Sequence, residues 1–173
     1  LDAVPNEATW GTENVAEITR ELILMDNQIT EVPDNGFDEC PYTNAVSLGL
    51  DRNEITFVGS RAFARLSNLN YLFIGTNPLK GIAVDALAGL TSLTRLSLTN
   101  TDLTSIPENL LNELTSLELL DLNLNKLTSF PENLLDGLAS LHSFYGYSNR
   151  LTSIPEKLLD GTPKLQSLEL YNN

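Results

Sequence analysis

Large apolar residues recur along the chain in a short pattern, apolar-x-x-apolar-x-apolar, which ends three residues later at a polar position. The copies span 19–27, 45–53, 69–77, 93–101, 117–125, 141–149 and 165–173; the first two lack the first leucine and have Thr19 and Ala45 there, and the sixth has Gly146 at its third apolar position. In the central part of each copy, apolar and polar residues alternate, and this alternation is typical of a β-strand. The pattern therefore predicts seven short strands spread over nearly the whole chain.

The copies repeat with a step of 24 residues, after a first step of 26. Their last position is asparagine in all copies but one: Asn27, Asn53, Asn77, Thr101, Asn125, Asn149 and Asn173. A second motif, Thr-Ser-(Ile/Phe)-Pro-Glu, recurs with the same step at 104–108, 128–132 and 152–156. A strand this short cannot bury its apolar face alone, whereas parallel stacking at about 4.8 Å per repeat builds one continuous core. We therefore expect a solenoid whose parallel sheet is roughly 30 Å long.

These motifs resemble the leucine-rich repeat family over residues 16–173. The resemblance implies an α/β solenoid, a right-handed horseshoe with a concave parallel β-sheet and short helical, 3₁₀ or irregular segments on the convex side. The 24-residue unit is similar to the "typical" subfamily of extracellular recognition proteins, which includes Toll-like receptors, variable lymphocyte receptors and small leucine-rich proteoglycans. In the family the recurrent asparagine hydrogen-bonds backbone groups of neighbouring turns. Thr101 is expected to keep only part of that bonding, because a hydroxyl replaces the amide.

The segments between the strands and the two ends complete the expected organisation. Ser105-x-x-Glu108 and its two counterparts have capping-box spacing with a proline in the first turn, so we expect one or two turns of helix or 3₁₀ helix there. Residues 1–15 carry no repeat and are expected to cap the first turn. The array of about seven repeats, 16–173, stops at a recurrent asparagine position without a cap. Further repeats or a partner are expected to cover that edge.

The composition argues against several classes of function. The 173 residues suit one domain, and 23 acidic against 10 basic side chains give a net charge of -13. This balance argues against nucleic acid as a partner and against a polybasic membrane patch. No run of 18 apolar residues is present, so we expect no membrane insertion. The single cysteine, Cys40, excludes an internal disulfide framework and a cysteine-based zinc site.

Candidate catalytic and metal-binding groups are few. Four residues have the spacing of an EF-hand calcium loop: Asp121, Asn123, Asn125 and Glu132. Lys126, however, stands where the loop needs glycine. Cys40 fills a slot taken by leucine in later repeats, which favours a small buried side chain, and His142 falls four repeats away at an outward strand position. No phosphate loop or nucleophile elbow is present. We therefore expect no enzyme activity, no metal and no other cofactor.

The outward positions of the strands carry several aromatic and charged side chains. Stacked strands place equivalent positions side by side, so one row is expected to hold Phe73, Ser97, Asp121, Tyr145 and Glu169. Tyr147 and Tyr171 are expected to be neighbours in another row. Gly146 replaces an inward leucine, which predicts a hole or distortion filled by Phe144 or by a tyrosine.

The candidate ligand-binding residues on the concave face are aromatic or charged: Tyr71, Phe73, Arg95, Asp121, His142, Tyr145, Tyr147, Glu169 and Tyr171. Exposed aromatic residues are enriched at interface hot spots. The alternative is that the tyrosines merely pack across strands and stabilise the sheet. The residues do not decide between these two interpretations.

Two functions remain open at this stage. The first is a recognition module that binds a protein, peptide or glycan through the concave face, as the family resemblance implies. The second is an assembly subunit of a larger extracellular or cell-surface complex, which packs through its C-terminal edge and convex face. The resemblance implies a location outside the cell or at its surface, although the sequence has no Asn-x-Ser/Thr glycosylation site.

Overall fold

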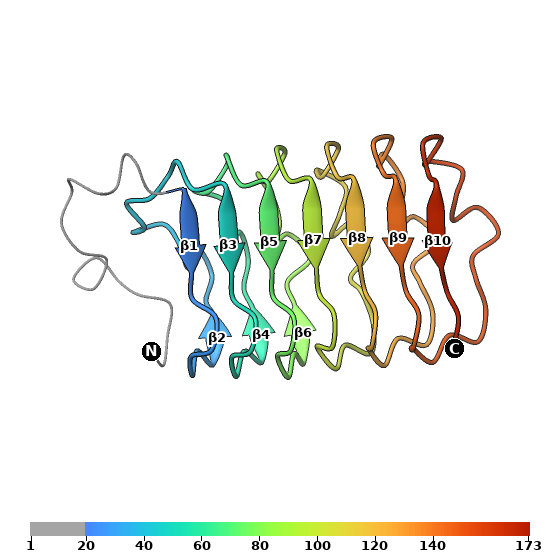
Figure 1. Ribbon diagram of the computed structural model, residues 1–173, viewed down its shortest axis with the longest axis horizontal. Helices are drawn as coiled ribbons and strands as arrows, with labels where there is room; N and C mark the ends of the chain where they lie inside the picture. The colour runs from blue at the N-terminus through green and yellow to red at the C-terminus, as the bar shows by residue number, and fades with distance from the viewer. Residues whose placement is uncertain (1–19) are drawn as a thin grey trace.

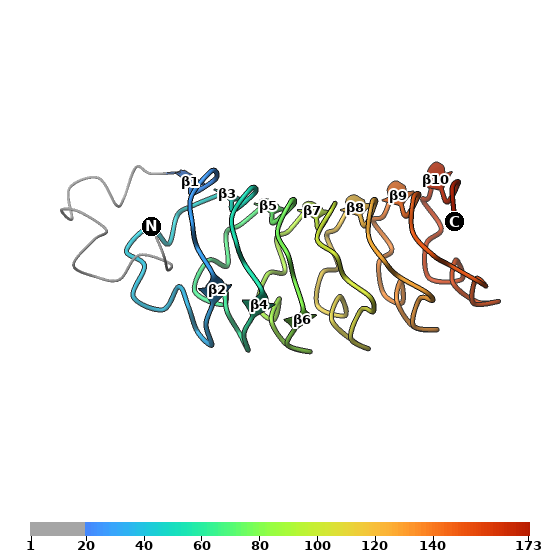
Figure 2. The same ribbon diagram turned by 90° about the horizontal axis from the view of Figure 1, so that it is seen from below.

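Seven parallel strands form the main sheet of the protein, as a computed structural model that describes residues 20–173 shows (Figure 1). The strands, in their order across the sheet, are β1 (Glu21–Ile23), β3 (Ser47–Gly49), β5 (Tyr71–Phe73), β7 (Arg95–Ser97), β8 (Leu119–Asp121), β9 (Ser143–Tyr145) and β10 (Ser167–Glu169). Each strand pairs in parallel with the equivalent strand of the next repeat. The strands line the concave side of a curved solenoid (Figure 2), which confirms the predicted fold. The expected cap, residues 1–15, lies outside the described residues.

The core consists of the inward apolar residues of every repeat. Leu48, Leu72, Leu96 and Leu120 are paired in register along the sheet and are completely buried. Cys40 is also buried, and this burial raises the pKa of its thiol. The prediction of Cys40 as a small core residue is therefore confirmed.

The recurrent asparagines form a ladder of buried hydrogen bonds, illustrated by Asn53. Its Nδ2 donates to the carbonyl of Leu50 in its own repeat at 2.9 Å and to that of Leu24 in the preceding repeat at 2.9 Å. Its Oδ1 accepts the backbone N–H of Ile29 at 3.1 Å. One amide thus satisfies three backbone groups that would otherwise be buried without a partner.

Thr101 breaks this ladder at one rung. Its hydroxyl lies 3.0 Å from the Leu98 carbonyl and 2.8 Å from Asn125 Oδ1, so it bonds within its own repeat and the next one. The backbone N–H of Leu79, in the preceding repeat, donates instead to the Thr101 carbonyl at 2.8 Å. The expected partial bonding of Thr101 is therefore confirmed, since a backbone carbonyl replaces the missing amide oxygen.

A second sheet, absent from the sequence-based expectations, runs along the flank of the first three repeats (Figure 1). It contains β2 (Glu31–Val32), β4 (Phe57–Val58) and β6 (Gly81–Ile82). The N–H groups of Gly59 and Ala83 donate to the carbonyls of Val32 and Val58, both at 2.8 Å. Pro107 occupies the equivalent position in the next repeat and has no N–H, so the sheet ends at β6.

The convex segments are turns, and residues 20–173 contain no helix, so none that could cross a membrane. After Pro107, backbone N–H groups donate three residues back at alternate positions, Leu110 to Pro107, Asn112 to Asn109 and Leu114 to Leu111. Asn109 also has a left-handed backbone (φ 64°), which interrupts a helix. The expected helical turns are therefore wrong, and the convex side has the irregular form that the family resemblance also allowed.

Candidate functional site

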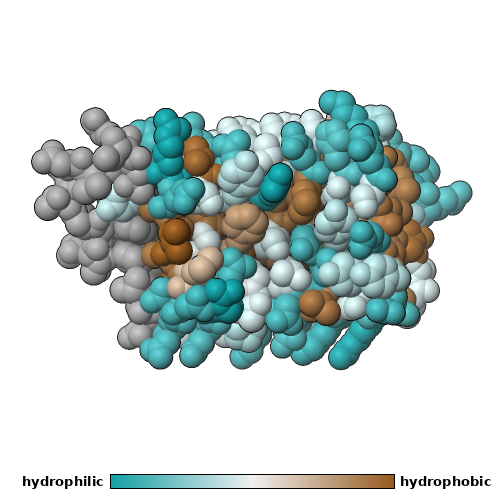
Figure 3. Space-filling view, in the orientation of Figure 1, coloured by the Kyte–Doolittle hydropathy of each residue, from teal (hydrophilic) through white to brown (hydrophobic). Residues whose placement is uncertain are grey.

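The outward residues of the main sheet form the concave face in regular rows. Strand register aligns Phe73 with Ser97, Ser97 with Asp121, Asp121 with Tyr145, and Tyr145 with Glu169. This is the predicted row, and the geometry is confirmed. Figure 3 shows apolar and polar residues intermixed over this face rather than one broad apolar patch.

Tyr147 and Tyr171 form a stacked pair two positions beyond this row. Their ring centroids lie 4.6 Å apart with an angle of 6° between the planes, which confirms that they are neighbours. The backbone N–H of Tyr147 donates to Asn123 Oδ1 at 2.9 Å, and this bond holds the backbone from which the tyrosine side chain extends. Tyr171 remains 55% exposed, so the pair offers a ring face to a ligand. The pKa of the Tyr171 hydroxyl is raised by partial desolvation and then by the charges of Tyr147 and Glu169.

Tyr71, Phe73 and Arg95 form a second aromatic group, on β5 and β7. The Tyr71 and Phe73 rings are nearly parallel, with centroids 6.5 Å apart. The Arg95 guanidinium carbon lies 5.5 Å from the centroid of the Tyr71 ring, which is a cation–π contact. The predicted aromatic site residues therefore lie in two groups, one on each side of β8, and the structure does not bring all five aromatic side chains together.

Charge is distributed unevenly along the concave face. The first four repeats carry both signs at their outward positions: Arg20, Glu21, Asp26, Asp51, Arg52 and Arg95. Arg52 Nη2 and Asp26 Oδ2 are 2.7 Å apart, and this hydrogen-bonded pair lowers the pKa of Asp26. The outward positions of the last three repeats carry Glu118, Asp121 and Glu169 without any lysine or arginine. The β8–β10 part of the face is therefore negative.

Three of the four side chains with EF-hand-like spacing, Asp121, Asn123 and Asn125, hydrogen-bond backbone groups. Asp121 Oδ1 accepts the N–H of Asn123 at 3.0 Å, and burial raises the pKa of the Asp121 carboxyl. Asn123 accepts from Tyr147, and Asn125 belongs to the ladder. Within residues 20–173, no three or more His, Cys, Asp or Glu side chains gather where they could hold a metal ion.

His142 lies on the flank of the sheet, just before β9, and is half-buried. Its carbonyl accepts the N–H groups of Gln166 and Ser167, and its own N–H donates to the Glu118 carbonyl at 2.9 Å. Its backbone is therefore part of the strand network. Its position beside Glu118 places it next to the negative part of the face.

Gly146 is surrounded by aromatic side chains beneath the same surface. The Phe130 and Phe144 ring centroids are 5.3 Å apart. A Cβ at Gly146 would lie 3.0 Å from Leu170 and 3.1 Å from Phe130. The hole expected there is thus filled by Phe144, as predicted, and by Phe130 and Leu170, which the sequence analysis missed. No tyrosine is needed to fill it.

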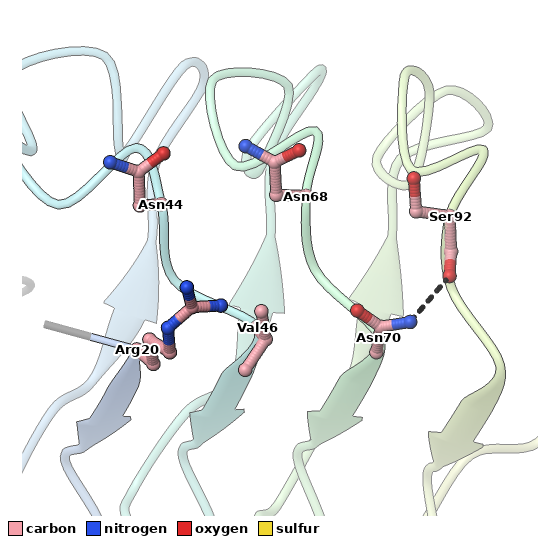
Figure 4. Close-up of a pocket in the computed structure, with 6 residues that line it drawn as sticks. All are labelled: Arg20, Asn44, Val46, Asn68, Asn70 and Ser92. Carbon is pink, nitrogen blue, oxygen red and sulfur yellow. Dashed lines mark hydrogen bonds between the residues drawn. The ribbon is translucent and has the colours of Figure 1, made fainter. Parts of the chain in front are cut away.

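A polar pocket of about 440 Å³, which the sequence analysis also missed, opens at the start of the first strands. It is lined by Arg20, Asn44, Val46, Asn68, Asn70 and Ser92. Asn44 and Asn68 come from the loops before β3 and β5, whereas Arg20, Val46 and Asn70 lie where strands begin (Figure 4). Asn70 Nδ2 donates to the Ser92 carbonyl at 3.4 Å. The available signal was the 24-residue repetition of Asn44, Asn68 and Ser92.

The fold is shared with many solved structures, of which 282 chains match. One is a crystal structure of a TLR13–ssRNA13 complex, with a TM-score of 0.82 and 25% sequence identity. The match covers 89% of this chain and 21% of that chain, so this protein spans about a fifth of the length of that relative. No curated protein sequence matches the chain.

The exclusion of nucleic acid as a partner is wrong. The TLR13 chain has the same fold and is solved in complex with single-stranded RNA. A net charge of -13 is a sum over the whole chain, whereas binding depends on the residues at the contact. Single-stranded RNA is also bound by stacking of its bases on aromatic side chains, which overall charge does not report.

The model of the leucine-rich repeat family matches residues 43–103 and 91–145, which is more than half of the chain. The match covers the central strands of the main sheet and the part of the asparagine ladder from Asn53 to Asn125. With the parallel register and the buried asparagines, the chain belongs to the leucine-rich repeat family of interaction modules.

Proposed function

We propose that the protein is a non-enzymatic recognition module that binds a protein or peptide ligand through its concave face. The observation that carries this proposal is the stacked Tyr147–Tyr171 pair, exposed on the face beside Tyr145. Tyrosine offers a large amphipathic contact area at a low cost in side-chain entropy. Such residues, gathered on one surface, are typical of binding hot spots.

The rigidity of the sheet supports the same function. Each strand is hydrogen-bonded to its neighbours, and the asparagine ladder fixes the turn that follows each strand. Side chains on such a scaffold are held in place before a ligand arrives, so little ordering entropy is lost on binding.

Cys40 and Asp121, the two groups most suited to chemistry, argue against catalysis. Cys40 is 1% exposed and burial raises its pKa, which disfavours the thiolate form that a nucleophile needs. Asp121, an acid of the concave row whose pKa is raised by burial, accepts a hydrogen bond from the backbone N–H of Asn123.

We further propose a location outside the cell or at its surface, which the 24-residue repeat supports.

The proposal is tested by selection from a displayed random-peptide library. The test variant is Tyr71→Ala/Tyr145→Ala/Tyr147→Ala, which removes rings from both aromatic groups. The matched control is Glu108→Ala/Glu132→Ala/Glu156→Ala, three exposed residues at one turn position of successive repeats. We expect the wild type and the control to enrich peptides and the test variant to lose that enrichment. Circular dichroism checks that all three proteins are folded.

Equal enrichment by the wild type and the test variant would place the ligand elsewhere and refute the concave-face proposal. A fluorescent single-stranded RNA forms the second arm of the test. If RNA binds and depends on the three tyrosines while no peptide is enriched, the ligand is nucleic acid and the proposal of a protein ligand falls.

A further inference from the structure

We infer that the β8–β10 part of the concave face binds arginine side chains of a basic protein segment, through a tyrosine–carboxylate patch of Asp121, Tyr145, Tyr147, Glu169 and Tyr171. The inference rests on the proposed function and names the chemistry of its ligand. It is carried by the register of three strands, by the stacked tyrosines and by the charge of the face.

The strand register places a carboxylate on each side of Tyr145. Asp121 on β8 and Glu169 on β10 are its direct partners in the row. Neighbouring strands are about 4.8 Å apart, so a cation seated on the Tyr145 ring lies within reach of both carboxylates. A guanidinium there gains a cation–π contact and charge-assisted hydrogen bonds at once.

The stacked pair extends the patch along the strands. Tyr147 and Tyr171 lie two positions beyond Tyr145 and Glu169, on the same outward side of the chain. Desolvation, then Tyr147 and then the charge of Glu169 raise the pKa of the Tyr171 hydroxyl, in keeping with a carboxylate near this end of the patch. An aromatic platform edged by carboxylates suits a planar cation better than a neutral side chain.

The protein itself already makes this kind of contact on the same face. The Arg95 guanidinium carbon lies 5.5 Å from the centroid of the Tyr71 ring. No lysine or arginine occupies an outward strand position in the last three repeats, so the three tyrosines there have no such cation from their own strands. Lys126, in the turn after Asn125, pairs with Asp102 at 2.8 Å.

Charge complementarity favours a positively charged ligand. Outward positions of the last three repeats provide three carboxylates and no balancing cation, whereas Arg52 and Asp26 pair with each other in the first repeats. Asp121 is half-buried, and partial removal from water strengthens its attraction for a cation. A basic segment therefore fits this part of the face, and arginine fits it better than lysine because its planar group can stack and donate in pairs.

The test measures fluorescence anisotropy with a labelled peptide of alternating arginine and glycine. A matched peptide carries citrulline, which has nearly the same shape as arginine but no charge. For the wild type in about 0.15 M salt, we expect the arginine peptide to bind about tenfold more tightly than the citrulline peptide. In Asp121→Asn/Glu169→Gln, this preference should fall to about twofold or less.

The control variant is Glu108→Gln/Glu132→Gln, which removes the same number of charges from exposed turn residues outside the sheet. It should retain the preference for arginine. Equal affinity for the two peptides in the wild type would overturn the inference, as would a preference that survives in Asp121→Asn/Glu169→Gln. Peptides from the displayed library whose enrichment depends on Tyr71, Tyr145 and Tyr147 but which lack arginine and lysine would overturn the inference and leave the proposed function intact.

Discussion

The Phe130 ring lies 5.3 Å from the Phe144 ring, centroid to centroid, and the two fill the space that a leucine would occupy at Gly146. In the preceding repeat these three positions hold Ile106, Leu120 and Leu122. Three departures from the repeat therefore compensate for one another. The core around Gly146 keeps its volume because two aromatic side chains and a glycine replace three aliphatic side chains.

Restoring a single leucine in this repeat should be destabilising. In Gly146→Leu, the new Cβ would lie 3.0 Å from Leu170 and 3.1 Å from Phe130, and the rest of the side chain would have no free space. We expect a loss of about 1–3 kcal/mol in the free energy of unfolding. Urea denaturation followed by circular dichroism measures it.

The combined variant Phe130→Ile/Phe144→Leu/Gly146→Leu, which reproduces the neighbouring repeats, is the matched control. It should recover most of the stability, because the three positions share one space and their effects are not additive. If the triple variant is as unstable as Gly146→Leu alone, then overpacking is not the cause.

The ladder predicts a difference between two substitutions at Asn77. Its amide group bonds Leu50, Ile74 and Ile55, and all these contacts are buried. Asn77→Ala leaves those groups without partners and should cost about 3 kcal/mol, whereas Asn77→Thr should cost less, because Thr101 shows that a hydroxyl keeps part of the bonding. Chemical denaturation of both variants tests this, and equal losses would contradict the assigned role of the hydroxyl.

A left-handed residue stands just before every rung of the ladder, and Leu124 is one of those whose side chain disfavours this backbone. The equivalent positions are Asp26, Arg52, Thr76, Asn100, Leu124, Ser148 and Asn172, all with φ between 53° and 57°. Leu124 is 50% exposed and has no side-chain hydrogen bond that favours this backbone. Leu124→Asn should therefore stabilise the protein by about 1 kcal/mol.

Thermal unfolding measures this gain. Leu119→Asn is the matched control, because Leu119 lies in the extended strand β8, where asparagine has no backbone advantage. It should not raise the melting temperature. A gain in both variants, or in neither, would show that the left-handed backbone at residue 124 is not the source of the effect.

The half-buried carboxyl of Asp121 predicts a pH dependence of stability. Burial raises its pKa above the ordinary value of 3.8, and the Asn123 N–H opposes this in part. The folded protein then binds a proton more readily than the unfolded chain, so the Asp121 contribution to stability improves as pH falls through the raised pKa towards 3.8. At neutral pH the ionised group is a cost.

Asp121→Asn removes this cost and keeps an oxygen for the Asn123 N–H. The variant should be more stable than the wild type near neutral pH, and its advantage should shrink as pH falls through the raised pKa of Asp121 towards 3.8. Urea denaturation at several pH values measures the difference. A difference that does not change with pH would show that desolvation of Asp121 does not contribute.

The repeat length and the Leu-x-Leu alternation were enough to predict the main sheet, its parallel order and the row from Phe73 to Glu169. These features follow from nearest-neighbour stacking, so equivalent positions must align. The turns after Pro107 were not predicted, because capping-box spacing is a local signal and the left-handed Asn109 overrides it. The separation of Tyr71 from Tyr145 was overlooked, although it follows from the count of intervening strands.

The pocket at Arg20 and the filling of Gly146 depend on side chains from different repeats meeting in space. A motif search within one repeat cannot detect such a meeting. Phe130 illustrates this, since its place in Ser-Phe-Pro looks like a simple exchange for isoleucine until Phe144 and Gly146 are seen beside it.

The prolines at the end of the small flanking sheet also decide how the later repeats are held together on that side of the molecule. Pro107, Pro131 and Pro155 stand at equivalent positions in three successive repeats and offer no N–H there. The ladder of that sheet runs from one repeat to the next, as from the Ala83 N–H to the Val58 carbonyl, so each proline removes one such bond to the preceding repeat. Over these repeats the flank is thus held together by side-chain packing at the point where the first three repeats use backbone hydrogen bonds.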